Sequence, residues 1–400
     1  MWWSRPEMVF GRQVAGENWR GTRRFLLGKK HISRESISPD WLKLSALSGL
    51  SALNKNRLLE PFGSADQLFA ASDQQLLDTF AGNRRTVACV QKARQVEIGF
   101  ICDWLALPGN GALSLQHRDY PAQLKVMPDA PVVLYFQGRS ELLSRPQLAV
   151  VGSRLATPLG RKITTELAAA LCGYGLGITS GLALGIDRAA HQAAMEHHGW
   201  TVAVAATGLD RVYPTCHTKL AQAIRQQGVL VSEYPPATPV TRWRFPQRNR
   251  LISGLSLGVL IVEAASRSGS LITARLAAEQ GREVFAVPGS IKSPLSRGCH
   301  ALLRQGAKLV ETITDIVEEL PVAVLTVPQS GQTEPSMTAS DLSTAVIDPI
   351  LALVGQEILT LDEIVVRSGL TAATVSAMLL RLEVEGRVAS TVDGRFQQLS

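Results

Sequence analysis

A nine-residue segment, 242–250, has the composition of a site that holds nucleic acid. Its sequence is Arg-Trp-Arg-Phe-Pro-Gln-Arg-Asn-Arg, with four arginines, two aromatic residues and no acid. The guanidinium fork of arginine bonds two phosphate oxygens at once, and an aromatic ring offers a face on which an unpaired base stacks. A charge run on a solvated surface is the other interpretation, but it would leave Trp243 and Phe245 needlessly exposed. The segment therefore predicts binding of a single-stranded nucleic acid.

The charge of the chain supports this interpretation because it is unevenly distributed. The 400 residues carry a formal charge of +7. Residues 147–311 hold eighteen basic and nine acidic side chains, whereas residues 321–400 hold four basic and nine acidic ones. A basic centre indicates a polyanionic partner for that part of the chain. The composition, 46% hydrophobic and 19% charged over this length, excludes a disordered chain and a single small binding module.

Loops rich in glycine and serine form a second set of candidate anion ligands. Each follows an apolar run, and small residues there allow backbone N–H groups to approach an anion. Together with the arginine segment they give the predicted DNA-binding residues: Gly152, Ser153, Arg154, Gly181, Gly185, Arg242, Arg244, Phe245, Arg248, Asn249, Arg250, Ser268, Gly269 and Ser270. The alternative is that the glycines only make tight turns. Neither GxGxxG nor GxxxxGK[ST] occurs in these loops, so a dinucleotide or ATP site is not predicted.

Catalytic groups are sparse. Asp187 and His191 are four residues apart on one predicted helix, and Glu233 and Glu263 end predicted strands, so acid–base pairs can be drawn. An Asp at a helix start is more often a cap, with a following His packed nearby. No Ser/His/Asp order or metal-ligand cluster stands out. We therefore expect a protein that is not an enzyme and holds no cofactor or metal.

The cysteines and the N-terminus indicate the compartment. The five cysteines are odd in number and widely spaced, at Cys89, Cys102, Cys172, Cys216 and Cys299. Neither their spacing nor the arginine-rich N-terminus is typical of a secreted protein, so we expect reduced thiols in the cytoplasm. The uncharged stretch 167–186 has the length of a membrane span, but its five glycines favour a helix end, a short strand and a loop, and no membrane association is predicted.

The elements that would position the candidate residues alternate from about residue 146. Apolar runs at 148–151, 175–179, 201–206, 229–233, 258–263 and 283–287 are mostly separated by helical patterns at 159–173, 187–199, 218–227 and 270–281. This alternation predicts a doubly wound α/β domain, a Rossmann-like parallel sheet covered on both faces. Ligands of such sheets bind beyond the carboxyl ends of the strands, where the glycine-rich loops lie.

Smaller parts flank this domain. We predict a basic, disordered extension over 1–37, a small helical domain over 38–105, the α/β domain over 106–320 and a flexible linker over 321–347. Helical patterns in the second part lie at 41–50, 55–62, 65–71 and 73–80. The stretch 47–51, followed by Lys55 and Arg57, is either a helix-hairpin-helix turn that binds a DNA phosphate or an αα-hairpin that only packs. The second interpretation is favoured because one of the two expected glycines is missing.

The last part, 348–400, is predicted to be a winged helix-turn-helix. Helical patterns at 361–368 and 371–385 precede a hairpin turned at Asp393-Gly394, and Thr371 is a candidate cap for the second helix. This part contains four arginines against seven acids. Phosphate would be repelled, so we expect it to contact protein rather than duplex DNA.

The order of several motifs resembles the DNA processing protein A family, also called DprA or Smf. The motifs are YP at 120–121, PVVLY at 131–135, VGSR at 151–154, SGLALGID at 180–187, TGLDRVYP at 207–214, FPQRNR at 245–250 and SGS at 268–270. The resemblance covers about residues 40–400 and implies an extended Rossmann-like domain with a helix-hairpin-helix or SAM-like helical domain before it. It places Arg154, Phe245, Arg248 and Arg250 in a basic DNA pocket.

The same resemblance implies a function. Such a protein binds single-stranded DNA, protects incoming DNA, forms a homodimer and loads RecA recombinase during natural transformation and homologous recombination. The alternative is a Rossmann-like enzyme that hydrolyses nucleoside monophosphates, but the Pro-Gly-Gly-x-Gly-Thr motif of such enzymes is absent. Two departures stand out: GCHALL at 298–303 replaces the family's Gly-x-Asn before Leu-Ile, and residues 1–36 have no counterpart.

Overall fold

The computed structural model describes residues 37–321 and 359–368, with short stretches between 375 and 398. The chain divides into two compact units, Met1–Pro328 and Gln329–Ser400. The extension predicted over 1–37 and the linker predicted over 321–347 lie outside the described residues, apart from one end residue of each.

Six short helices begin the first unit. They are α1 (Pro39–Ala46), α2 (Ala52–Leu59), α3 (Ala65–Ala70), α4 (Asp73–Thr79), α5 (Arg84–Arg94) and α6 (Gly99–Ala106). A serine precedes each of the first four and accepts a bond from a backbone N–H of the first turn: Ser38, Ser51, Ser64 and Ser72. These caps satisfy donors that a short helix otherwise leaves unpaired. The four predicted helical patterns are confirmed, with boundaries shifted by up to four residues.

A nine-stranded sheet lies at the centre of this unit, in the order β1-β2-β6-β5-β4-β3-β7-β8-β9. The strands are β1 (Asn110–Ser114), β2 (Val133–Gly138), β3 (Gln147–Val151), β4 (Gly177–Ser180), β5 (Thr201–Val204), β6 (Val229–Ser232), β7 (Gly258–Ile261), β8 (Glu283–Ala286) and β9 (Lys308–Leu309). The doubly wound α/β fold is confirmed. The sheet is mostly rather than wholly parallel, because β2 runs antiparallel to both β1 and β6. Antiparallel strands need no crossover helix, so the alternation of strand and helix could not reveal this edge.

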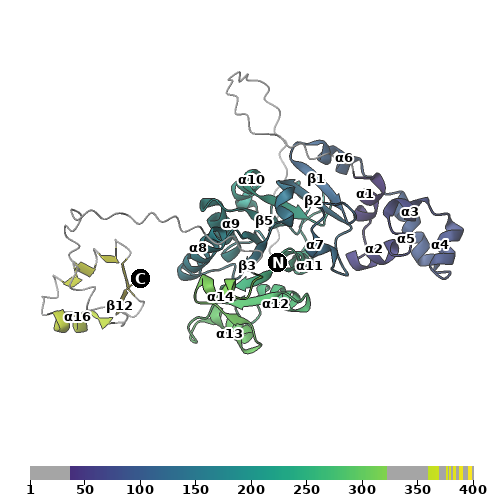
Figure 1. Ribbon diagram of the computed structural model, residues 1–400. Helices are drawn as coiled ribbons and strands as arrows, with labels where there is room; N and C mark the ends of the chain where they lie inside the picture. Colours follow the sequence, from purple (N-terminus) through teal and green to yellow (C-terminus); the bar gives the residue numbers. More distant parts are fainter. Residues whose placement is uncertain are drawn as a thin grey trace, which may run out of the picture. The chain divides into compact units, whose positions relative to one another are not determined.

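Helices cover both faces of the sheet (Figure 1). They are α7 (Ala122–Lys125), α8 (Pro158–Gly173), α9 (Ile186–Glu196), α10 (Thr218–Gln227), α11 (Arg244–Gly254), α12 (Ser270–Glu279), α13 (Arg297–Arg304) and α14 (Ile313–Val317), with short 3-10 turns at 140–144, 215–217 and 294–296. Side chains of β3 alternate between two cores: Ala149 and Val151 pack with α11 and α12, and Leu148 and Val150 pack with α8 and α9. Burial on both faces explains the continuous apolar run of this strand.

The stretch 167–186 contains the end of α8, strand β4 and a loop, as predicted. Among the described residues, no helix combines the length and the apolar character that crossing a bilayer requires.

The six N-terminal helices pack on the sheet through a shared core. The Tyr135 hydroxyl of β2 lies 2.6 Å from the Ser45 hydroxyl of α1, and its ring lies 6.2 Å from that of Trp104 in α6, nearly perpendicular to it. Leu44 and Leu68 belong to the same buried cluster as Tyr135. The helices are therefore held against the β1–β2 edge.

The second unit contains β10 (Leu359–Thr360), α16 (Leu361–Ser368), β11 (Val388–Ser390) and β12 (Arg395–Gln398), with the strands antiparallel in the order β10-β12-β11. Leu359, Ile364 and Leu379 lie in its small core. The predicted helix at 361–368 is confirmed. The turn at Asp393-Gly394 and the cap at Thr371 lie outside the described residues.

Candidate nucleic-acid interface

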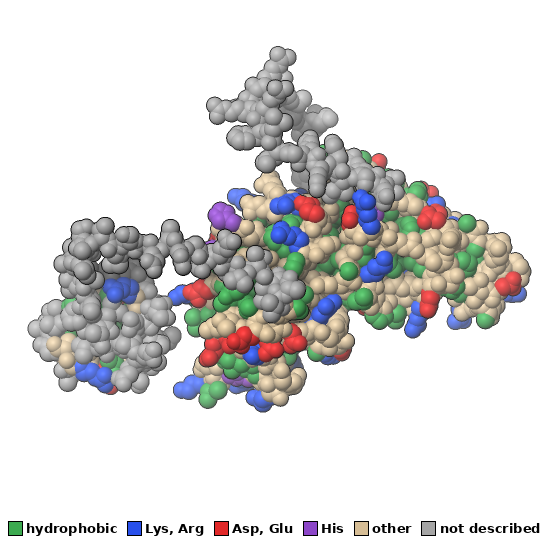
Figure 2. All heavy atoms as spheres, viewed as in Figure 1, with side chains coloured by type: hydrophobic (Ala, Val, Ile, Leu, Met, Phe, Trp, Pro, Cys, Tyr) green, Lys and Arg blue, Asp and Glu red, His purple; other side chains and the backbone are tan. Residues whose placement is uncertain are grey.

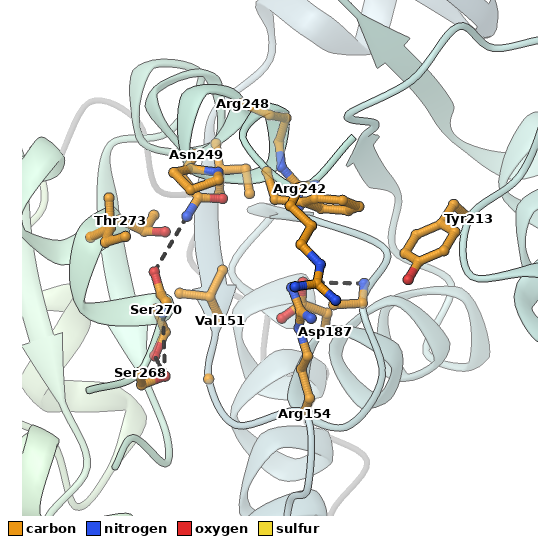
Figure 3. A pocket seen from close by; sticks show the side chains of 17 residues that line it. Val151, Arg154, Asp187, Tyr213, Arg242, Arg248, Asn249, Ser268, Ser270 and Thr273 are labelled. Carbon is orange, nitrogen blue, oxygen red and sulfur yellow. Dashed lines mark hydrogen bonds between the residues drawn. The ribbon is translucent and has the colours of Figure 1, made fainter. Parts of the chain in front are cut away.

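A cavity of about 700 Å³ lies at the carboxyl ends of β3 and β7 (Figure 3). The strand order reverses between these two strands, and open α/β sheets bind their ligands at such a switch point. Nine of the predicted DNA-binding residues line this cavity: Gly152, Arg154, Arg242, Phe245, Arg248, Asn249, Ser268, Gly269 and Ser270. The fold thus brings together loops that are more than a hundred residues apart in the sequence.

Arg154 and Arg242 are the free cations of this cavity. Both are exposed, and neither has an acidic partner in the part of the chain that the structure describes. Figure 3 shows their side chains reaching toward one another from opposite sides of the cavity. Like charges repel at short range, so an anion between them would be attracted by both. On the surface in Figure 2, by contrast, Lys and Arg side chains are scattered among acidic ones.

Two aromatic rings lie beside these arginines. The ring centroids of Tyr213 and Phe245 are 5.4 Å apart, and the Arg154 guanidinium carbon lies 5.8 Å from the Phe245 centroid. Tyr213 is 46% exposed, so its ring remains available to a ligand. Sequence reasoning missed Tyr213 as a site residue, although it lies in the TGLDRVYP motif, because nothing local indicates that this loop reaches Phe245.

The start of α12 forms another side of the cavity. The Ser268 and Ser270 hydroxyls lie 2.7 Å apart, and the Asn249 amide donates to the Gly269 carbonyl oxygen at 3.3 Å. A Cβ added to Gly269 would meet no atom within 4 Å, so packing does not require this glycine. The first N–H groups of α12 are bonded within the turn 268–272, so this helix start favours an anion through its dipole and its hydroxyls.

The start of α8 is already occupied by an anion of the protein itself. The Glu263 carboxylate accepts bonds from the Thr157 backbone N–H at 3.0 Å and the Thr157 hydroxyl at 2.6 Å. A Cβ on Gly160 would lie 2.4 Å from the Glu263 carboxyl carbon. Glu263 is therefore a helix cap, which leaves the α12 start as the open one of the two.

Other predicted glycines serve the packing of the chain. A Cβ on Gly152 would lie 2.7 Å from a side-chain carbon of Ile186, and one on Gly185 would lie 2.1 Å from the Ser153 carbonyl oxygen. Gly185 also has a φ of +76°, a conformation that favours glycine. Ser153 is buried, and its carbonyl accepts the Ile186 N–H at 3.1 Å. At these positions the contacts agree with the alternative interpretation, in which the glycines only make tight turns.

Arg248 lines the cavity but is only 4% exposed. Its Nη1 donates to the Gly181 carbonyl oxygen at 2.7 Å and to the Val204 carbonyl oxygen. A Cβ on Gly181 would lie 2.5 Å from this nitrogen, so the glycine makes room for the guanidinium. Burial lowers the pKa of Arg248 to about 10, which leaves it charged at neutral pH.

Asp187 fixes the loop that precedes α9. Its Oδ2 accepts the N–H groups of Gly181 at 3.0 Å and Ala183 at 3.3 Å. Burial raises the pKa of Asp187, and the nearby Arg248 charge opposes that shift. These donors precede α9, whose start has no side-chain cap, so the capping role that the sequence favoured is wrong and Asp187 holds the loop instead.

His191 is buried beneath the same loop. Because the Thr201 hydroxyl donates to the Ile178 carbonyl oxygen at 2.7 Å, the His191 Nδ1–H must donate to that hydroxyl, also at 2.7 Å. Its Nε2 then accepts the Leu182 N–H at 3.3 Å. Burial lowers the pKa of His191 to about 3, so the ring is neutral and packed as predicted.

Arg244 and Arg250 lie outside this cavity. The Arg250 guanidinium forms ion pairs with Glu233 and with Asp129, the latter at 3.3 Å, and the side chain is 10% exposed. The Arg244 guanidinium carbon lies 5.0 Å from the centroid of Tyr234. The reason is that most of the arginine segment belongs to α11, a helix that sequence analysis did not predict. Successive residues of a helix point about 100° apart, so one segment contributes side chains to two sides.

The fold and this site define a class: a Rossmann-like α/β protein with a cationic, aromatic-lined cavity at its switch point. A family model described as DNA recombination-mediator protein A matches residues 111–321, and one described as DprA winged helix domain matches residues 334–394. The chain belongs to this family, known as DprA or Smf, and DNA processing in recombination is the function that the membership supports.

Individual relatives agree. Protein Smf of Escherichia coli K12 is 38% identical over 357 residues, which covers 88% of this chain and 94% of the relative. DNA processing protein DprA of Streptococcus pneumoniae R6 is 47% identical over 273 residues, which covers 68% and 94%. The X-ray structure of DprA from Streptococcus pneumoniae superposes with a TM-score of 0.64 at 38% identity, over 70% of this chain and 98% of that one.

Proposed function

We propose that the chain binds single-stranded DNA in the cavity between β3 and β7. The observation that carries the proposal is the pair of arginines, Arg154 and Arg242, which face one another beside the Phe245–Tyr213 rings and have no acidic partner among the described residues. A phosphate between the two guanidinium groups brings its nucleoside next to the rings. An unpaired base exposes the face that stacking requires, whereas a base inside a duplex does not.

Arg248 and Arg250 take supporting roles in this proposal. Arg248 lines the cavity, but its Nη1 is bonded to the Gly181 and Val204 carbonyl oxygens. Arg250 is held by Glu233 and Asp129. Both therefore position α11, and the dipole at the start of α12 adds a further attraction for the phosphate.

On family membership we further propose the cellular role predicted from the motifs. The protein forms a homodimer, protects incoming DNA and loads RecA recombinase onto it during natural transformation and homologous recombination. Its five free cysteines fit a reducing, cytoplasmic compartment. The proposal gives no catalytic role to Asp187, His191 and Glu263, since each accepts a backbone N–H of the protein itself. Incubation with nucleoside monophosphates, followed by chromatography, should show no consumption.

Titration of labelled oligonucleotides tests the DNA site. We expect the wild type to prefer single strands to duplexes. The variant with Arg154→Ala and Arg242→Ala should bind single strands about 100-fold more weakly or worse, and the slope of log K against log salt should fall by about 2. Arg84→Ala with Arg85→Ala removes two exposed arginines of α5 that do not line the cavity and is the matched control. Equal affinity of the two double variants would contradict the proposal.

A further inference from the structure

A second cavity of about 710 Å³ lies between the turn that joins α1 to α2 and the end of β6. Helix α11 contributes Phe245 and Arg248 to the first cavity and Arg244 and Gln247 to the second. At 3.6 residues per turn these pairs point about 100° apart, toward adjacent sides of the helix. One helix therefore separates the two cavities, and its start joins them.

The rim of the second cavity is an aromatic stack. The Arg244 guanidinium carbon lies 5.0 Å from the Tyr234 ring centroid and 4.9 Å from that of Trp243, so the cation interacts with both rings. Trp243 is nevertheless 56% exposed. An exposed tryptophan held by an arginine offers the flat platform on which any base stacks.

The wall below the rim is polar but balanced in charge. Lys55 and Arg250 oppose Asp129 and Glu233. Arg250 Nη1 and Glu233 Oε1 have no hydrogen-bond partner among the described residues, although these side chains are only 10% and 11% exposed. A donor beside an acceptor without net charge suits the edge of a nucleobase better than a phosphate, which the two carboxylates would repel.

The turn between α1 and α2 forms the outer wall. Ser48 and Gly49 line the cavity and are exposed, and a Cβ on Gly49 would meet nothing within 4 Å. This is the stretch in which the sequence left open a helix-hairpin-helix turn. This turn lines the same cavity as Trp243, so it can lie beside a bound single strand and needs no duplex DNA as its ligand.

We propose that the second cavity is a base-binding subsite for the strand held in the first cavity. The strand passes the start of α11, one base stacks on Trp243, and its edge faces Arg250 and Glu233. Arg244 lies beside the phosphate of that nucleotide. The inference rests on the proposed function, because the first cavity anchors the strand.

Oligonucleotides of two lengths test the subsite. A dinucleotide occupies the first cavity alone, whereas a strand of about 16 nucleotides reaches both. Trp243→Ala should weaken binding of the longer strand about tenfold and leave the shorter one unchanged. Phe100→Ala is the matched control: Phe100 is 55% exposed, lies in α6 and lines neither cavity. Unchanged binding of the longer strand, or equal weakening of both lengths, would overturn the subsite.

Charge at the outer wall gives an independent test. Ser48→Glu adds an anion beside the path of the strand and should weaken only the longer oligonucleotide, while Ser48→Gln, of the same size, should not. If the Arg154→Ala and Arg242→Ala variant keeps wild-type affinity for both lengths, the proposed function itself fails. If that variant loses both while Trp243→Ala and Ser48→Glu change neither, the subsite alone fails, and the cavity then receives another occupant, such as a segment of this chain.

Photocrosslinking locates the base directly. Oligonucleotides that carry 5-iodouracil at single positions crosslink to the aromatic side chain on which that base stacks. We expect one set of positions to yield peptides with Phe245 or Tyr213 and another to yield peptides with Trp243 or Tyr234. Crosslinks to the first pair alone would overturn the proposal.

Discussion

Arg154 and Arg242 differ from Arg248 and Arg250 in their exposure to solvent and in the groups to which they are bonded. The first two are exposed and have no carboxylate partner among the described residues, whereas the second two are 4% and 8% exposed and are bonded to carbonyl or carboxylate oxygens. Three of the four lie within nine residues of the sequence. The difference teaches that a cluster of arginines divides into side chains that are free to meet a ligand and side chains that hold the site together.

The largest effect on stability should follow the replacement of Arg250, a buried arginine that is paired with two carboxylates. Arg250→Ala leaves the Glu233 and Asp129 carboxylates without their cation, and removal of one partner from a buried ion pair costs about 3–5 kcal/mol. Urea denaturation followed by circular dichroism measures this loss. Burial raises the pKa of Glu233 and the Arg250 charge opposes that shift, so in the variant this pKa rises further. The variant should therefore regain part of its stability as the pH falls and the carboxyl is protonated.

A second variant separates this effect from general damage to α11. Arg250→Ala combined with Glu233→Gln should lose less stability than Arg250→Ala alone, because the amide needs no cation. An exposed ion pair contributes about 1 kcal/mol or less to stability. A loss below that value for Arg250→Ala would contradict the distinction between the two kinds of arginine.

An intermediate effect is expected where Arg248 lies against Gly181. Gly181→Ala puts a Cβ 2.5 Å from Nη1 and displaces the guanidinium from its carbonyl acceptors, which should cost about 1–3 kcal/mol. In the Arg248→Ala background the same substitution should cost much less, so a double-mutant cycle in urea denaturation measures the coupling. Gly269→Ala is the control, because its Cβ meets nothing within 4 Å. Equal costs of Gly181→Ala in both backgrounds would show that Arg248 is not what this glycine accommodates.

The smallest effect on stability belongs to the exposed pair. Arg154→Ala and Arg242→Ala should each change the free energy of unfolding by less than about 0.5 kcal/mol, since both side chains are exposed and neither has an ion-pair partner among the described residues. Thermal denaturation without DNA is the measurement. A destabilisation as large as that of Arg250→Ala would mean that these side chains stabilise the fold, and the contrast would disappear.

Sequence patterns predicted the part of the fold that depends on local periodicity. The parallel strands β3 to β8 and the helices α8, α9, α10 and α12 lie where apolar runs and helical spacing indicated. Strand β9, of two residues, was not predicted, and neither were β1 and β2, whose antiparallel pairing needs no crossover helix. Helix α11 was not predicted because its arginines indicated a ligand-binding segment. The helical spacing of Leu251, Ile252 and Leu255 on its buried side was therefore overlooked.

The candidate site was predicted in its location more than in its contacts. The loops at the carboxyl ends of the strands follow from the fold class, so Arg154 and the start of α12 could be foreseen. The partners of Arg250 could not, because Asp129 and Glu233 come from distant loops. The role of Gly181 could not be predicted either, because the guanidinium for which it makes room belongs to Arg248, 67 residues further along the chain.

The bond between Ser45 and Tyr135 also affects how the molecule unfolds. Tyr135 belongs to β2, which is hydrogen bonded to β6, and Glu233 follows β6 and holds Arg250 of α11. The N-terminal helices are thus linked to the arginine helix through the sheet, with which they share one apolar cluster. Such a chain of contacts makes residues 37–321 a single cooperative block, whose helices and sheet should melt in one transition rather than in two.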